Sequence, residues 1–172
     1  MGGKIIVIGC PGSGKSTFAR ELHQKSGIPL YPLDNIYWRK DRSIVEKEIF
    51  LSQLRDIMKK EEWILDGNYA STMEERMEKC DSVFFLDIPV NVCLAGIESR
   101  KGKKREDIPW VEEETDKAFL ESVKRYEKEQ RPRVMELLKK YSCKEIHIFH
   151  SRKETEEYLQ EQKNVHTERK DE

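Results

Sequence analysis

The residues with the plainest chemistry form a glycine-rich run near the N-terminus that ends in a lysine and a serine. Residues 9–16 read GCPGSGKS and fit the pattern G-x-x-x-x-G-K-[ST] at every fixed position. Glycines let the backbone curl until successive N–H groups point inward at an anion, and Lys15 supplies an ammonium for the β- and γ-phosphates. Ser16 offers a hydroxyl to Mg²⁺. The run therefore predicts a Mg-ATP site built from Gly9, Pro11, Gly12, Ser13, Gly14, Lys15, Ser16 and Thr17.

Three aspartates follow short apolar runs along the chain, at Asp34, Asp66 and Asp87. If those runs are parallel strands, all three acids lie at the edge of the sheet where ligands bind. Asp66 follows the run WIL, and we expect it to hold Mg²⁺ through water opposite Ser16. We expect Asp34 to bind the acceptor or its proton. The alternative for each acid is a helix cap or a turn, and the nearby Pro89 favours a turn at Asp87.

A basic segment between two predicted helices could complete such a site. It is grouped around Gly102 and contains Arg100, Lys101, Lys103, Lys104 and Arg105. Phosphoryl transfer requires positive charge around the transferring group, so residues 100–111 are predicted to form a lid that closes over ATP and excludes water. We expect Arg100 and Arg105 to bind phosphate there. The alternative is a solvated basic loop balanced by the glutamates at 112–114.

Strands and helices alternate along the chain, and their order predicts how these residues are brought together. Short apolar runs predict strands at 4–9, 30–33, 63–65, 82–86 and 145–149. Helical spacing and capping signals predict helices from 15 to a stop at 27, then at 44–60, 71–79 (capped by Ser71), 89–100, 111–141 and 151–159 (capped by Ser151). This order predicts an α/β fold of three layers around a five-stranded parallel sheet. Residues 1–161 are expected to form one domain, followed by a disordered polar tail at 162–172.

Composition limits the classes of partner. The chain has 172 residues with 32 basic and 33 acidic side chains, so no global field attracts nucleic acid or an anionic membrane. No apolar run approaches the roughly 20 residues that a membrane helix needs. The four cysteines are spread without a CxxC pair, which favours free thiols in a reducing, cytoplasmic compartment. We expect a monomer or a homodimer, because the sequence distinguishes neither.

Several segments together resemble a known family. These are the phosphate-binding run, LDNIYW at 33–38, WILDGNY at 63–69, FLDIP at 85–89, Arg131-Pro132 and SRKE at 151–154. Over residues 3–160 the chain is similar to the DNA topology modulation proteins of the FlaR type, which are P-loop proteins related to adenylate kinase. The resemblance implies an adenylate-kinase-like core with strand order 2-3-1-4-5, a mobile lid, and an adenine contact from Arg152. It also implies phosphate-binding roles for Arg76 and Arg131, for which surface ion pairs are the alternative. Gly96 stands where the family pattern suggests a further basic residue.

Two functions are consistent with these residues. The first is a kinase that transfers the γ-phosphoryl group of Mg-ATP to a small acceptor, with a nucleoside monophosphate or a similar compound as the leading candidate. The second is a nucleotide-dependent regulatory ATPase that acts on DNA or on a protein partner. Only the basic segment at 100–105 supports the second function, and the balanced net charge counts against DNA as the partner.

Overall fold

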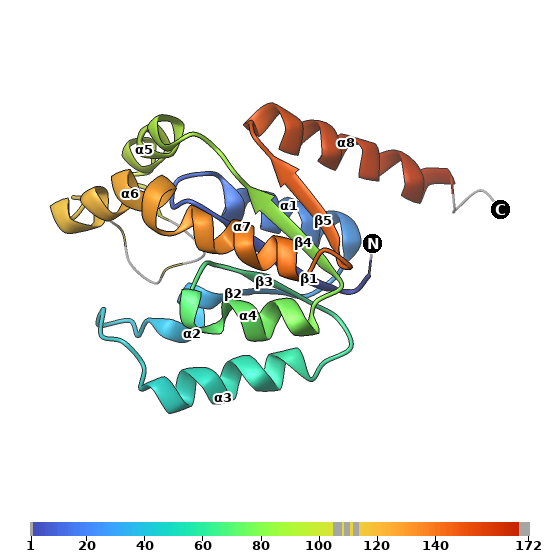
Figure 1. Cartoon of the computed structure of the whole chain (residues 1–172), viewed down its shortest axis with the longest axis horizontal. Helices are drawn as coiled ribbons and strands as arrows, with labels where there is room; N and C mark the ends of the chain where they lie inside the picture. The colour runs from blue at the N-terminus through green and yellow to red at the C-terminus, as the bar shows by residue number, and fades with distance from the viewer. Residues whose placement is uncertain (1, 105–107, 109–110, 112–113, 169–172) are drawn as a thin grey trace.

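A computed structural model describes residues 2–104, 108, 111 and 114–168 (Figure 1). Five strands form one parallel sheet: β1 (Lys4–Gly9), β2 (Leu30–Pro32), β3 (Trp63–Asp66), β4 (Ser82–Leu86) and β5 (Glu145–Phe149). The strand order is β2-β3-β1-β4-β5, which confirms the predicted order. β1 is therefore central, and the glycine-rich run begins at its carboxyl end.

Helices connect successive strands and cover both faces of the sheet. Their bounds are α1 (Lys15–Ser26), α2 (Leu33–Tyr37), α3 (Lys47–Met58), α4 (Ala70–Lys79), α5 (Val90–Ser99), α6 (Lys117–Glu129), α7 (Arg131–Lys140) and α8 (Arg152–Glu168). Helices α3 and α4 lie on one side of the sheet and α8 lies on the other (Figure 1). Among the residues that the structure describes, no helix is both long enough and apolar enough to span a membrane.

The core is divided between the two faces of the sheet because neighbouring residues of a strand point in opposite directions. In β1, Ile5 and Val7 pack with α1, α5, α6 and α8, whereas Ile6 and Ile8 pack with α3, α4 and α7. All four side chains are fully buried. This explains why β1 reads as a continuous apolar run instead of an alternating one.

Several predicted elements differ from the observed ones. The long helical pattern at 111–141 is divided into α6 and α7 at Gln130, where Pro132 occupies the first turn of α7. The prediction that Ser71 caps α4 is wrong, because the helix begins at Ala70 and Tyr69 precedes it in the left-handed conformation. The last helix continues to Glu168, beyond the predicted end at residue 159, so the predicted tail begins inside a helix.

The register of the sheet brings the predicted acids to one edge. Val7 of β1 pairs with Asp66 of β3, and Gly9 pairs with Leu86 of β4. Asp87 follows Leu86 directly. β2 ends one residue earlier than predicted, so Asp34 lies in the short helix α2 and not at a strand end.

Candidate active site

The glycine-rich run forms a tight loop between β1 and α1. Gly12 and Gly14 adopt left-handed backbone conformations, with φ of 84° and 95°, which glycine adopts without strain. The Ser13 amide donates to the Cys10 carbonyl at 3.0 Å. A Cβ on Gly12 would lie 2.1 Å from the Cys93 carbonyl oxygen of α5, so the loop also needs glycine there for close packing. The sequence thus folds into a compact loop that precedes a helix N-terminus, an arrangement that binds anions.

A cavity of about 540 Å³ opens in front of this loop. Its lining includes residues 12–17 of the loop and the start of α1, together with the cations Arg20, Arg100, Lys104 and Arg152. The lysine of the loop, Lys15, lies in the same wall. Positive charge from three separate parts of the chain therefore converges on the phosphate loop, as a polyphosphate requires. The roles of the individual residues remain predictions.

Arg152 contacts the loop directly, and Gly96 makes this contact possible. The Arg152 Nη2 atom donates to the Gly12 carbonyl oxygen at 3.1 Å. A Cβ on Gly96 would lie 2.4 Å from that same oxygen and 2.6 Å from Arg152 Nη2. The glycine in α5, where a basic residue was expected, thus leaves room for a guanidinium from α8. Arg105 of the predicted lid lies outside the described residues.

A second cavity, of about 380 Å³, has Ser16 and Asp66 in its walls. Asp66 is only 4% exposed, and the buried guanidinium of Arg76 interacts favourably with its charge. Within the described part of the chain, no group of three or more His, Cys, Asp and Glu side chains could hold a metal ion. A hydroxyl and a carboxylate beside a phosphate loop fit Mg²⁺ that is also bound by nucleotide oxygens and water. Ser16 and Asp66 are therefore suited to this ion.

Asp34 lies apart from both cavities and is held by a tyrosine. The Tyr69 hydroxyl donates a hydrogen bond to Asp34 Oδ1. Burial and the nearby Asp34 carboxylate raise the pKa of Tyr69, so its hydroxyl remains a donor. The Tyr69 ring packs against Tyr37 and Phe50, with ring centres 4.8 Å and 5.4 Å away. Asn35, the next residue along the chain, lines the second cavity. Asp34 itself does not line it.

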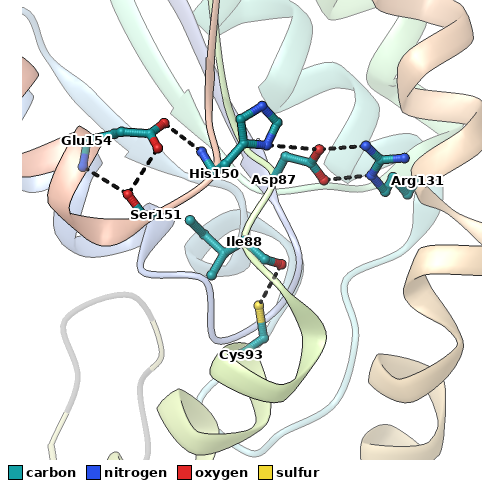
Figure 2. A network of polar contacts seen from close by, with 7 residues as sticks. All are labelled: Asp87, Ile88, Cys93, Arg131, His150, Ser151 and Glu154. Atoms are coloured by element: carbon teal, nitrogen blue, oxygen red, sulfur yellow. Dashed lines mark hydrogen bonds and ion pairs between the residues drawn. The ribbon is translucent and has the colours of Figure 1, made fainter.

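Asp87 pairs with Arg131, for which the family resemblance implies a phosphate-binding role. The Arg131 Nε and Nη2 atoms each lie 2.7 Å from a different Asp87 oxygen, and this pairing raises the pKa of Arg131 (Figure 2). His150 Nδ1 lies 3.5 Å from Asp87 Oδ2. Arg131 lines neither cavity, so its phosphate role stays a prediction. Asp87 forms a specific ion pair, which the expectation of a plain turn did not include.

The cap at the start of α8 appears in the same view (Figure 2). The Glu154 amide donates to Ser151 Oγ at 3.2 Å, and the His150 amide donates to Glu154 Oε2 at 2.8 Å. The first bond confirms that Ser151 caps the last helix, and the second ties the Glu154 carboxylate to the residue before the cap. The cap fixes the first turn of α8, from which Arg152 reaches the phosphate loop.

The structure corrects the expectation for Arg76. Its side chain is fully buried in α4, and burial lowers its pKa to about 10. The guanidinium donates to the backbone carbonyls of Gly67, Asn68 and Tyr69 and to Thr72 Oγ1. Arg76 therefore stabilises the loop after β3, and it neither lines a cavity nor forms a surface ion pair.

Asn68 was not among the predicted site residues. Its side-chain amide forms two hydrogen bonds to the backbone of Gly9, the first residue of the phosphate loop. Asn68 follows the strand-end acid Asp66 by two residues and lies in the WILDGNY segment that carries the resemblance, but neither signal indicates this contact.

Part of the chain is similar in sequence to curated adenylate kinases. The chain is 31% identical over 87 residues to adenylate kinase of Thermotoga neapolitana, and 32% identical over 85 residues to adenylate kinase of Thermosipho melanesiensis. Each match covers 48% of this chain and 38% of the relative, so the chain matches well under half the length of these enzymes. No family model matches the chain.

Solved structures superpose on more than nine tenths of the chain. Shikimate kinase from Bacteroides thetaiotaomicron superposes with a TM-score of 0.55 at 17% identity, covering 94% of this chain and 96% of that one. A sugar kinase from Janibacter sp. gives 0.53 at 16% identity, covering 91% and 90%. The chain has the fold of P-loop kinases. The finer resemblance to DNA topology modulation proteins remains a prediction.

Proposed function

We propose that this protein is an ATP-dependent kinase that phosphorylates a small acceptor. The observation that carries the proposal is the cavity at the phosphate loop, where Lys15, Arg100, Lys104 and Arg152 converge on a curled glycine backbone at a helix N-terminus. This arrangement supports the binding of a nucleoside triphosphate. The adenylate kinase relatives favour ATP as the donor.

The residues of the chain have separable tasks in this proposal. Lys15 and Arg100 neutralise charge on the transferring phosphoryl group, and Arg152 closes the side of the loop at Gly12. Ser16 and Asp66 would hold Mg²⁺, which when bound draws charge from the phosphate oxygens. Asp34 orients the acceptor or accepts its proton. Because catalysis of phosphoryl transfer is mainly positioning, these groups suffice without a covalent intermediate.

We propose a nucleoside monophosphate, or a compound like it, as the acceptor. The sequence relatives are adenylate kinases, and this favours a nucleotide. The structural neighbours are a shikimate kinase and a sugar kinase, so hydroxyl compounds form the second group to test. Asp34 and Asn35 can accept hydrogen bonds from a hydroxyl in either group.

The test measures ADP release from Mg-ATP in the presence of nucleoside monophosphates, nucleosides, sugars and small hydroxy acids. We expect one acceptor to raise ADP release well above the rate with water, and Lys15→Ala to abolish the increase. If ATP binds tightly and no acceptor raises the rate, the kinase proposal is wrong, and a regulatory ATPase becomes the better explanation. Product analysis by mass spectrometry then identifies the phosphorylated compound.

A further inference from the structure

The segment Gly67–Tyr69, between β3 and α4, contacts both the phosphate loop and Asp34. Asn68 Oδ1 accepts from the Gly9 amide at 3.1 Å, and Asn68 Nδ2 donates to the Gly9 carbonyl at 2.8 Å. One side chain thus satisfies both backbone groups of the first loop residue. Because both bonds come from one planar amide, they fix the orientation of Gly9 as well as its position.

The next residue contacts the acid on the acceptor side. Tyr69 donates its hydroxyl to Asp34 Oδ1, while its ring packs against both Tyr37 and Phe50. Its backbone lies in the left-handed region, with φ of 37°, which is uncommon for a bulky side chain and carries strain. Such a conformation persists only where surrounding contacts determine it. The ring packing and the bond to Asp34 are two of these contacts.

Arg76 provides a third contact that determines the backbone conformation of this segment. Its buried guanidinium donates to the carbonyls of all three residues of the segment, which fixes their peptide planes. The Gly67 amide donates to the Val7 carbonyl of β1 at 3.1 Å. The segment is therefore tied to the sheet, to α4 and to the phosphate loop at once.

We propose that Asn68 and Tyr69 are positioning residues that form a bridge between the phosphate loop and Asp34, so that nucleotide bound at the loop orders the acceptor side. This inference rests on the proposed function, since it requires a nucleotide at the loop. The bridge has two links, Asn68 to Gly9 and Tyr69 to Asp34. Each link can be cut separately, because Asn68→Ala removes the first and Tyr69→Phe removes the hydroxyl of the second.

Hydrogen exchange with and without Mg-ADP tests the bridge, and it needs no identified acceptor. In the wild-type protein we expect Mg-ADP to slow exchange at residues 9–17, at 67–69 and at 33–37. With Tyr69→Phe the slowing at 33–37 is lost, while that at 9–17 and 67–69 remains. With Asn68→Ala the slowing beyond the loop is lost, and calorimetry shows about tenfold weaker binding of Mg-ADP.

Tyr37→Phe is the matched control, because it removes a hydroxyl from the same aromatic cluster and leaves the Tyr69–Asp34 bond in place. It is expected to behave as the wild type. Suppose that Mg-ADP binds and slows exchange at 33–37 equally in the wild type and in both bridge variants, or that it binds and slows exchange there in none of them. Either result overturns the bridge and leaves the proposed function standing. If the wild type gives no binding heat with Mg-ADP or Mg-ATP, the proposed function itself fails, and the bridge fails with it.

Discussion

Replacing Gly96 with alanine tests how closely α5 must approach the phosphate loop. Two effects on stability oppose each other. Alanine in place of glycine inside a helix normally stabilises a protein by about 0.5–1 kcal/mol. Here the new Cβ would lie 2.4 Å from the Gly12 carbonyl oxygen, and the two atoms must separate by at least 0.6 Å to reach the 3.0 Å that real Cβ contacts respect.

Overpacking of this kind costs about 1–3 kcal/mol, so the net effect on unfolding free energy is a loss of about 0–2.5 kcal/mol. The larger effect is expected on binding. The Gly12 carbonyl is backbone and cannot rotate away, so the loop or the helix must shift, and the Arg152 bond to Gly12 is lost. Displacements near 1 Å in a catalytic site can cost about a hundredfold in rate, and we expect Mg-ADP affinity to fall at least about tenfold.

The assays are urea unfolding and isothermal calorimetry with Mg-ADP. Asn91→Ala, at an exposed position in the first turn of the same helix, controls for adding alanine to α5 without a new contact to the loop. The double variant with Arg152→Ala separates the two contacts of the new Cβ, and we expect the loss to persist because the backbone contact remains. If Gly96→Ala is more stable than the wild type and binds Mg-ADP equally well, the close packing of α5 on the loop is refuted.

Three further predictions follow from buried and paired groups. Arg76→Lys keeps the charge but loses the forked donors on the loop carbonyls, so urea unfolding should show a loss of about 3 kcal/mol. Under native conditions a thiol reagent should label the exposed Cys143 quickly, and unfolding should be needed to label Cys10, Cys80 and Cys93. The hydrogen bonds from Arg55 lower the pKa of Glu75 below 4.5, so their stabilisation is full above that pH and is lost as pH falls through the lowered pKa. Glu75→Gln should therefore cost about 0.5 kcal/mol at pH 7, and this cost should shrink as the pH falls through the lowered pKa, as measured by unfolding across the acid range.

The sheet and the phosphate loop could be predicted because their signals are local. A continuous apolar run followed by glycines and GKS determines β1, the loop and the start of α1, and the resemblance supplied the strand order. The break between α6 and α7 was missed although Pro132 marks it, because the apolar spacing continues through both helices. Asp34 was expected at a strand end, and β2 stops before it because Leu33 begins a short helix.

The bridge at Gly67–Tyr69 was not predictable in the same way. Asn68 and Gly9 are 59 positions apart, and the contact uses a side-chain amide on backbone groups, which leaves no complementary residue type to recognise in the sequence. Tyr69 and Asp34 are 35 positions apart and could have been paired only once both loops were placed. Such contacts depend on tertiary position, so a single sequence does not encode them as a motif.

The arginines that the family resemblance placed at the nucleotide have different surroundings in the structure. Arg76, Arg131 and Arg152 were all expected to face the nucleotide. In the structure Arg76 donates hydrogen bonds to three backbone carbonyls, and Arg131 donates hydrogen bonds to both carboxylate oxygens of Asp87. Arg152 alone of the three lines the cavity, and it does so because Gly96 leaves the space that its guanidinium needs. A guanidinium can bind a phosphate only through donors that the fold leaves available. Arg152 gives one bond to the Gly12 carbonyl and still lines the cavity, whereas the donors of the buried Arg76 are directed at the backbone.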